Sequence, residues 1–444
     1  MRLLNLIAVF AVLCLFLFMP GAKAQAESAL DLEKAVRLGL ERNQSLQAVR
    51  EALLGSEYGV KSARGAFGPT LKSTYTYTRL DERPSGMDPA TGRRIKDSRD
   101  MWSFNLNVQQ PIFTGYRILS SYEKARLGNE MVNSQLTKAE LDLILEIQRT
   151  FMDLLAARES VRVANDSLTR LKSHLNVSQS FYDVGLAPKL DVLQAQVDVA
   201  QAEQDLISAE NAVDNLEAKL DMLLFIPLGQ NTKYQGELIY IPFELELEEC
   251  RELALANRPD IFMADKSVQM ALKDERITAS SFYPSLGANF DYYRRGDSPA
   301  VSGSKLQDRD EWRASLRMEW TLFEWGRTYY AYKQDGQKIR ELMAEYESLI
   351  RNVAFEVKVG YLQISESRKR IMVARQALEE ARESYRMAQA RYEAQVGTNT
   401  DVLDAQAKLS GAEANLISAN ADYLKALASI YNAMGQKNIA LGSF

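Results

Sequence analysis

Four segments of the chain alternate between apolar and polar residues. In 102–110, tryptophan, phenylalanine, leucine and valine alternate with serine, asparagine and glutamine, and 70–79, 285–293 and 312–321 behave alike. A period of two is typical of a β-strand with one apolar and one polar face. We therefore predict four strands, each close to the ~10 residues that a tilted membrane-spanning strand requires.

The long segments that follow these strands have a helical pattern. The segment 115–184 contains no proline and a single internal glycine, Gly128, and 325–395 also contains no proline. The helices that we predict after them cover 190–225 and 400–435. Their apolar residues recur at intervals of three and four, which is the heptad spacing of a coiled coil; in the first of them the series begins with Val192, Ala195, Val199 and Ala202. At ~1.5 Å per residue the longer helices would reach roughly 100 Å.

The chain consists of two copies of one unit. The residues that recur about 210 to 215 positions apart, in the same order, include Pro69 and Pro284, Trp102 and Trp312, and Asp191 and Asp401. Each of the two aspartates begins an Asp-Val-Leu segment. The boundaries that we predict are 25–226 for the first copy, 227–246 for a linker and 247–444 for the second copy.

The N-terminus has the features of an export signal. Arg2 precedes the almost uninterrupted apolar stretch 3–19, and Pro20 ends it. Small residues follow at Ala22 and Ala24. We predict that 1–24 is a secretory signal peptide that is cleaved after Ala24.

Composition excludes several classes of function. The formal net charge of −5, without a basic block, argues against nucleic acid as a partner. His174 is the one histidine, and Cys14 and Cys250 are the only cysteines. We therefore expect no catalytic, cofactor or metal site, because such sites need several of these residues. We interpret His174 as a solvated residue of a polar helix and Cys250 as a packing residue.

The predicted sheet fits either a soluble core or a membrane barrel. The loops 80–101 and 293–311 between paired strands are long and charged, as in outer-membrane barrels. The tryptophans lie in or beside the strands, as interface girdles do, and they are Trp102, Trp312, Trp320 and Trp325. Four strands cannot close a barrel, so two, three or four copies of the chain would have to pool 8, 12 or 16 strands.

This organisation resembles the TolC-like outer-membrane efflux proteins. The sharpest pieces of the resemblance are the two helical turns, Val184-Gly185-Leu186 and Val396-Gly397-Thr398, each followed by Asp-Val-Leu. The resemblance implies a mixed fold that assembles as a homotrimer, with a 12-stranded β-barrel in the outer-membrane lipid and a coiled-coil α-helical barrel in the periplasm. It implies a passive exit duct that works with a periplasmic adaptor (membrane fusion protein) and an inner-membrane transporter, in efflux or type I secretion.

The resemblance also implies roles for individual residues. The two turns would be tips that dock with the adaptor. Asp401 and Asp404 would form an acidic ring at the periplasmic entrance, where it would concentrate cations. The alternative is structural, because Thr398 and Asp401 could form a helix capping box.

Two positions depart from the family pattern. Gln194 provides no second acid in the first copy, and Asn399 stands where a basic gate residue is expected. Arg386 or Arg391 could take over that role from the neighbouring helix.

Three other functions compete with the duct. A soluble periplasmic coiled-coil adaptor or scaffold would bury the apolar face of the strands in its own core. A trimeric surface adhesin would concentrate its strands at one end of the chain. An enzyme is the weakest of the three, because titratable catalytic groups are scarce.

Overall fold

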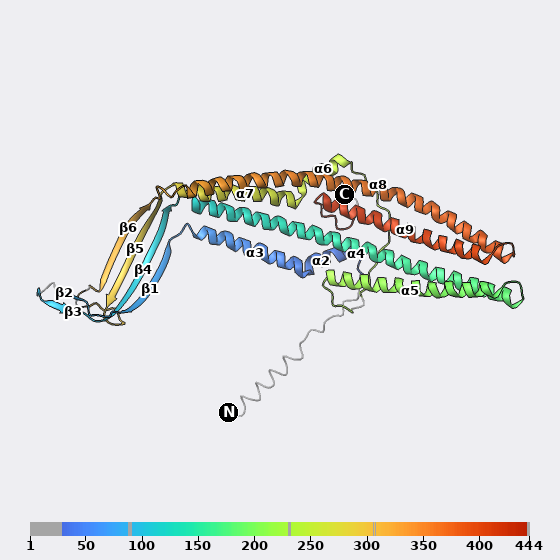
Figure 1. Ribbon diagram of the computed structural model, residues 1–444, viewed down its shortest axis with the longest axis horizontal. Helices are drawn as coiled ribbons and strands as arrows, with labels where there is room; N and C mark the ends of the chain where they lie inside the picture. Colours follow the sequence, from blue (N-terminus) through green and yellow to red (C-terminus); the bar gives the residue numbers. More distant parts are fainter. Residues whose placement is uncertain (1–28, 88–90, 230–231, 305, 307, 442–444) are drawn as a thin grey trace, which may run out of the picture.

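The molecule is elongated, with strands at one end and helical turns at the other (Figure 1). The computed structural model describes residues 29–87, 91–229, 232–304, 306 and 308–441. The expected signal peptide lies outside these residues. Among the residues that the structure describes, no helix is both long enough and apolar enough to cross a membrane.

Helices make up most of the chain. In chain order they are α2 (Leu32–Arg42), α3 (Gln44–Gly65), α4 (Arg117–Asp183), α5 (Lys189–Leu223), α6 (Leu247–Asn257), α7 (Pro259–Ala279), the short 3-10 helix η1 (Ser280–Phe282), α8 (Arg327–Glu393) and α9 (Asn399–Ala433). The strands are β1 (Thr70–Arg79), β2 (Ser85–Met87), β3 (Arg94–Lys96), β4 (Asp100–Phe113), β5 (Ser285–Gly296) and β6 (Asp310–Glu319). The predicted mixed fold is confirmed.

The two halves of the chain have matching elements. The helices α4 and α8 each have 67 residues, and α5 and α9 each have 35. Each half begins with two helices, α2 and α3 in the first half and α6 and α7 in the second. The first pair breaks at Asn43, whose side chain accepts hydrogen bonds from the backbone of Ser45 and Leu46. The second pair breaks at Arg258, because Pro259 cannot continue a preceding helix but suits its first position.

The main sheet is antiparallel, with strand order β1-β4-β5-β6. One face gathers aromatic rings, since Tyr77 lies opposite Trp102 and Tyr292 lies opposite Trp312. The strand β4 runs further than expected because its register shifts between Pro111 and Phe113, which lets pairing continue past the proline.

The segment 80–101 is not only a loop. It contains a small hairpin in which β2 pairs with β3. The hairpin has no apolar alternation long enough to read from sequence, which explains why we expected only a loop there.

The apolar core lies halfway along the helices. Buried residues from α4, α5 and α9 meet there, among them Ile147, Phe151, Leu220 and Leu427. The segment 232–246 crosses this region as a strap, since the hydroxyl of its Tyr234 donates to Asp221 on α5 over 2.6 Å. At the other end of the strap, the carbonyl of Ile241 accepts from the hydroxyl of Tyr423 on α9 over 2.5 Å. The strap therefore connects the two halves at the level of the core.

Ile147 provides a test of this core. Replacing it by Ala removes packed methyl groups from a fully buried position on α4. We expect the free energy of unfolding to fall by about 2–5 kcal/mol, as measured by circular dichroism in denaturant. The same truncation at the exposed Ile239 should change it by less than about 0.5 kcal/mol. Equal losses in the two variants would contradict this placement of the core.

Candidate functional site: the helical tips and the contact between the hairpins

The first tip is a tight turn closed by a glycine. After α4, the N–H of Leu186 donates to the carbonyl of Phe181 over 2.8 Å, and the N–H of Gly185 donates to Tyr182 over 2.9 Å. Gly185 has φ 78°, in the left-handed region that favours glycine. The turn joins α4 to α5, and we call this pair the first hairpin.

The second tip has the same hydrogen bonds on different residues. After α8, the N–H of Val396 donates to Arg391 over 2.9 Å, and Gln395 has φ 60°. Gln395 therefore corresponds to Gly185, and Gly397 does not. The two Val-Gly motifs are therefore not structurally equivalent, because Val396 takes the place of Leu186, two positions after Val184. Gly397 is needed for a different reason, since a Cβ there would lie 3.1 Å from the Cβ of Arg391.

Both tips expose apolar side chains. Val184 is 68% exposed, Leu186 59% and Val396 67%. Thr398 is the N-cap of α9, the second helix of the pair α8 and α9 that we call the second hairpin. Exposed branched side chains on two neighbouring turns form a surface suited to a protein partner.

Asp401 caps the helix on which it lies. Its carboxylate accepts from the N–H of Thr398 over 3.0 Å, and the hydroxyl of Thr398 accepts from the N–H of Asp401 over 3.2 Å. The expected capping box is therefore confirmed. The hydrogen bonds from Thr398, with a smaller contribution from Arg391, hold the pKa of Asp401 below its usual range. The carboxylate is charged at neutral pH.

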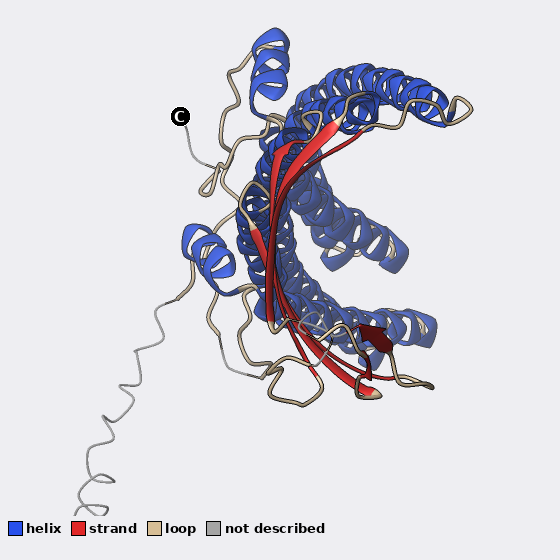
Figure 2. Ribbon diagram, turned by 90° about the vertical axis from the view of Figure 1, so that its left-hand side faces the viewer, coloured by secondary structure: helices blue, strands red, loops and turns tan. Residues whose placement is uncertain are grey.

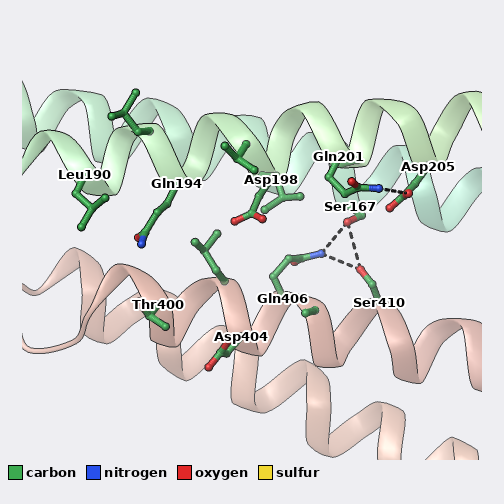
Figure 3. Close-up of a pocket in the computed structure, with 16 residues that line it drawn as sticks. Ser167, Leu190, Gln194, Asp198, Gln201, Asp205, Thr400, Asp404, Gln406 and Ser410 are labelled. Carbon is green, nitrogen blue, oxygen red and sulfur yellow. Dashed lines mark hydrogen bonds between the residues drawn. The ribbon is translucent and has the colours of Figure 1, made fainter.

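Asp404 lies one turn further along α9, at the edge of a groove between α5 and α9 (Figure 3). The groove has a volume of about 790 Å³. Its walls combine the apolar Leu190 and Leu193 with the carboxylates of Asp198 and Asp205. Acidic residues of both hairpins thus line the same groove near the tips.

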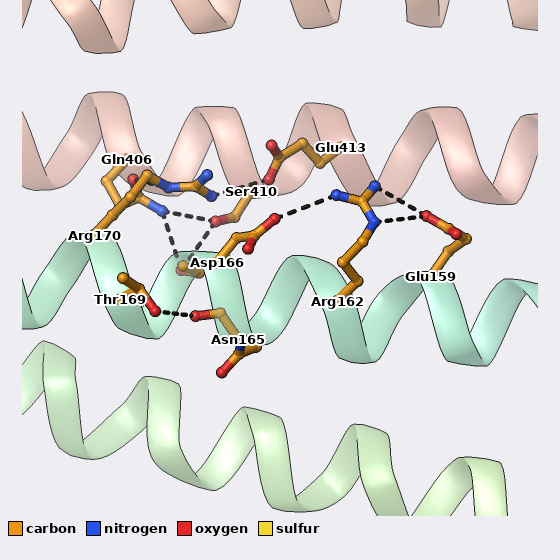
Figure 4. Close-up of polar contacts among 10 residues, drawn as sticks. Glu159, Arg162, Asn165, Asp166, Thr169, Arg170, Gln406, Ser410 and Glu413 are labelled. Carbon is orange, nitrogen blue, oxygen red and sulfur yellow. Dashed lines mark hydrogen bonds and ion pairs between the residues drawn. The ribbon is translucent and has the colours of Figure 1, made fainter.

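The two hairpins meet through a polar contact between α4 and α9. Arg170 donates to Gln406 and to Glu413, over 3.0 Å in each case (Figure 4). Gln406 in turn donates to Ser167 and Ser410 over 3.0 Å. Within each hairpin the buried heptad residues are instead apolar. In the half towards the tips, each hairpin is therefore a packed unit, and the weaker contact lies between the hairpins; further up, the apolar core joins them.

His174 belongs to this contact, and our interpretation of it as a solvated residue was wrong. It is 6% exposed, and its Nε2 lies 2.6 Å from Oδ1 of Asn399. Because the amide of Asn399 donates to Gln194 over 3.0 Å, its oxygen is left to accept from Nε2–H. The ring also packs on Tyr392, with centroids 5.0 Å apart. Burial lowers the pKa of His174.

The two departures from the family pattern are therefore partners of one another. Asn399 and Gln194 bond across the hairpins, where sequence reasoning assigned them no role. The available signal was a polar stripe at helical spacing on α4, which comprises Ser167, Arg170, His174 and Ser178. Of the two candidate basic residues, Arg391 contributes to the field at Asp401, whereas Arg386 pairs with Glu383 over 2.6 Å.

The tryptophans occupy both ends of the sheet. Trp102 packs on Tyr77 with ring centroids 4.5 Å apart, and Trp312 stacks on Phe290 at 6.2 Å. These two lie towards the β2–β3 end. Trp320 and Trp325 lie at the helical end, and Trp325 is 89% exposed.

The chain belongs to the family described as "Outer membrane efflux protein", which matches residues 35–224 and 250–436. It is 26% identical to the alkaline protease secretion protein AprF of Pseudomonas aeruginosa, over 86% of this chain and 79% of that protein. It is 24% identical to the cobalt-zinc-cadmium resistance protein CzcC of Cupriavidus metallidurans, over 88% and 86%. The structure of the outer membrane protein VceC of Vibrio cholerae has the same fold, with a TM-score of 0.80, 17% identity and coverage of 91% and 96%.

The protein is therefore an outer-membrane efflux channel whose helical part lies in the periplasm. The strands mark the membrane end and the turns mark the periplasmic end. The competing soluble adaptor is not supported.

The buried histidine predicts a pH dependence of the contact between hairpins. Asp191 and Asp198 on α5, Tyr392 on α8 and Asn399 on α9 face His174. Because the buried ring has a lowered pKa, the contact is at full strength above the ordinary histidine pKa of about 6.5 and weakens as the pH falls below it. We expect channel conductance in planar bilayers to rise between pH 7.5 and 5.5.

His174→Gln is the matched control, since its amide can still donate to Asn399 but does not titrate. Its conductance should vary much less over the same pH range. An equal rise in wild type and H174Q would remove His174 from the explanation.

Proposed function

We propose that three copies of the chain form one passive exit duct. The observation that carries this proposal is the four-stranded sheet, whose outer strands β1 and β6 each have an unpaired edge. The sheet and helices form an open arc that a single chain does not close (Figure 2). Because unpaired backbone groups cannot face lipid, the edges must pair with other copies. Three copies supply the 12 strands that the family resemblance implies.

The positions of the tryptophans agree with a barrel that spans the bilayer along the strands. Trp102 and Trp312 would lie at the outer interface, and Trp320 and Trp325 at the periplasmic one. Amphipathic aromatic side chains prefer both interfaces. Their separation along the strands agrees with one pass of each strand through the membrane.

The tips would dock with a periplasmic adaptor. The exposed Val184, Leu186 and Val396 supply apolar contact, while Gly185 and Gly397 allow a close turn. Thr398 fixes the start of α9 beside them. The energy for transport would come from an inner-membrane transporter that the adaptor connects to the duct.

Opening would be a movement of one hairpin against the other. The apolar heptads keep each hairpin intact, and the polar contact through Arg170, His174 and Gln406 can exchange its partners for water at low cost. An adaptor that binds the tips better in the open arrangement would shift the equilibrium towards it.

Asp401 and Asp404 would line the entrance to this duct. Three copies would place six carboxylates around a narrow opening, where they attract cations and repel anions. The capping role of Asp401 is compatible with this, because its carboxylate is charged in both roles.

The oligomeric state tests the central proposal. We expect the detergent-corrected mass of protein extracted from outer membranes to equal three chains. Light scattering with refractive-index detection measures this mass directly. A monomer or dimer found in the soluble periplasmic fraction would contradict the duct.

Ion selectivity tests the acidic entrance. The double variant D401N/D404N keeps the capping box, because the amide oxygen of Asn at position 401 can still accept from the N–H of Thr398, but it removes both charges. We expect its cation-over-anion permeability ratio to fall several-fold towards unity in bilayers at about 0.1 M salt, where charges still act over roughly 10 Å. Glu41→Gln, on the exposed surface of α2, is the control. Unchanged selectivity in D401N/D404N would rule out the ring.

A further inference from the structure

The two halves of the chain repeat each other's contacts, not only their elements. Phe67 packs edge-on against Tyr122 with ring centroids 5.9 Å apart, and Phe282 packs in the same way against Tyr332 at 6.0 Å. These two pairs show which residues are equivalent in the two halves. A residue of α3 corresponds to the residue of α7 that lies 215 positions later, and a residue of α4 to the residue of α8 that lies 210 positions later. In the sheet, Tyr77 opposite Trp102 corresponds to Tyr292 opposite Trp312.

The seam between the two halves, where α4 lies against α7, has three distinctive contacts. Glu130 pairs with Lys266 over 2.8 Å. A Cβ on Gly128 would lie 3.9 Å from the Sδ-bound methyl of Met270. A Cβ on Gly115 would lie 2.5 Å from the carbonyl oxygen of Ser280, so no larger residue fits there.

The chain also has two open flanks, formed by the outer sides of α3 and α8, which lie at opposite edges of the helical layer (Figure 1). If the next protomer continues the arc, α3 of that protomer packs against α8 of this one in the way that α7 packs against α4 within the chain. Replacing each residue of a seam contact by its counterpart in the other half then gives a contact between chains. Those contacts are Arg340 with Glu51, Lys338 with Gly55, and Trp325 with Gly65 of the next protomer.

We propose that α8 of one protomer packs on α3 of the next through these three pairs. The inference rests on the proposed trimer and specifies its contacts. Each pair remains complementary although its members have changed sides. The acid–base pair Glu130–Lys266 becomes the base–acid pair Arg340–Glu51, and the small Gly128 and Gly115 become the large Lys338 and Trp325.

The opposing side of the proposed contact has the space to receive the larger side chains. The glycines Gly55 and Gly65 on α3 have open space where a Cβ would point. Glycine inside a helix costs about 1 kcal/mol relative to alanine, so Gly55 needs a reason in packing. A neighbouring helix that places Lys338 over it supplies that reason. Trp325 has φ 55°, a strained backbone conformation, and its ring contacts Phe323 but remains 89% exposed.

The strands agree with the helices. In the structure Leu106 of β4 lies opposite Tyr292 of β5, and Val108 lies opposite Phe290. The same correspondence places Leu316 of β6 opposite Tyr77 of the next β1, and Met318 opposite Tyr75. All of these residues lie on the apolar face, as correct pairing requires, since a slip of one residue would move them to the polar face.

The tip half of the seam behaves differently. There the contact of Arg170 with Glu413 would correspond to Glu380 facing Glu203 of the next protomer, two like charges. Neighbouring protomers are therefore held by complementary pairs near the membrane, whereas the counterpart of the Arg170–Glu413 ion pair is missing near the tips. At this position near the tips Glu203 is paired with Lys172 of its own chain over 2.8 Å, so it adds no attraction between neighbouring protomers.

A charge exchange tests the ion pair. In Glu51→Arg and in Arg340→Glu, like charges face each other, and we expect the temperature at which the trimer dissociates in mild detergent to fall by at least about 3 °C. The double variant E51R/R340E should restore it. Glu41→Arg, a charge reversal on α2 away from both flanks, should have no effect.

Cysteine cross-linking tests the position of the helices. Gly55→Cys combined with Lys338→Cys should give covalent trimers on oxidation, and either cysteine alone should give none. Cys250 is buried and stays in all variants. A wild-type trimer with neither rescue nor cross-links would overturn the proposed seam and leave the trimer standing. A wild-type protein that is not trimeric would overturn both.

Discussion

The structure depends on the requirement that no backbone hydrogen-bonding group be left unpaired in lipid. A sheet of four strands ending in β1 and β6 cannot meet this requirement alone. The duplicated unit is one response, since it provides paired strands that are already in register, and the self-association that we propose is the other. The long helices follow from the same arrangement, because each strand pair continues directly into a helical pair that prolongs the wall of the barrel into the periplasm.

The helices make two kinds of contact, apolar within each hairpin and polar between the hairpins near the tips. Apolar heptad residues such as Val192 and Val402 are buried inside their hairpins, where separation would expose them to water. Arg170, Gln406 and their partners lie between the hairpins, where water can replace each hydrogen bond. The strap at Tyr234 and Ile241 holds the hairpins together above this polar contact. Movement is therefore easiest at the tips, where we propose that the duct opens.

Periodic features could be predicted from the sequence, and contacts between distant segments could not. The strand at 70–79 and the end of α4 near residue 183 follow from alternation and from the absence of proline. His174 looked solvated because its own helix is polar, and only the approach of Asn399 from α9 buries it. The two Val-Gly motifs misled for a related reason: equal letters do not reveal that Gly185 has φ 78° while Gln395, not Gly397, takes that conformation in the second turn.

Because the two copies lie in one chain, their sequences can differ from each other. In a ring of six identical single-copy units, the same residues would have to form every contact between neighbouring units. In this chain Gly115 fits against Ser280 within the protomer, and Trp325 occupies the corresponding position at the open flank. The seam inside the chain and the seam between chains can therefore differ in strength along their length. In the trimer that we propose, that difference would allow a continuous wall that is tight in the membrane and weaker at the entrance, without any hinge in the helices themselves.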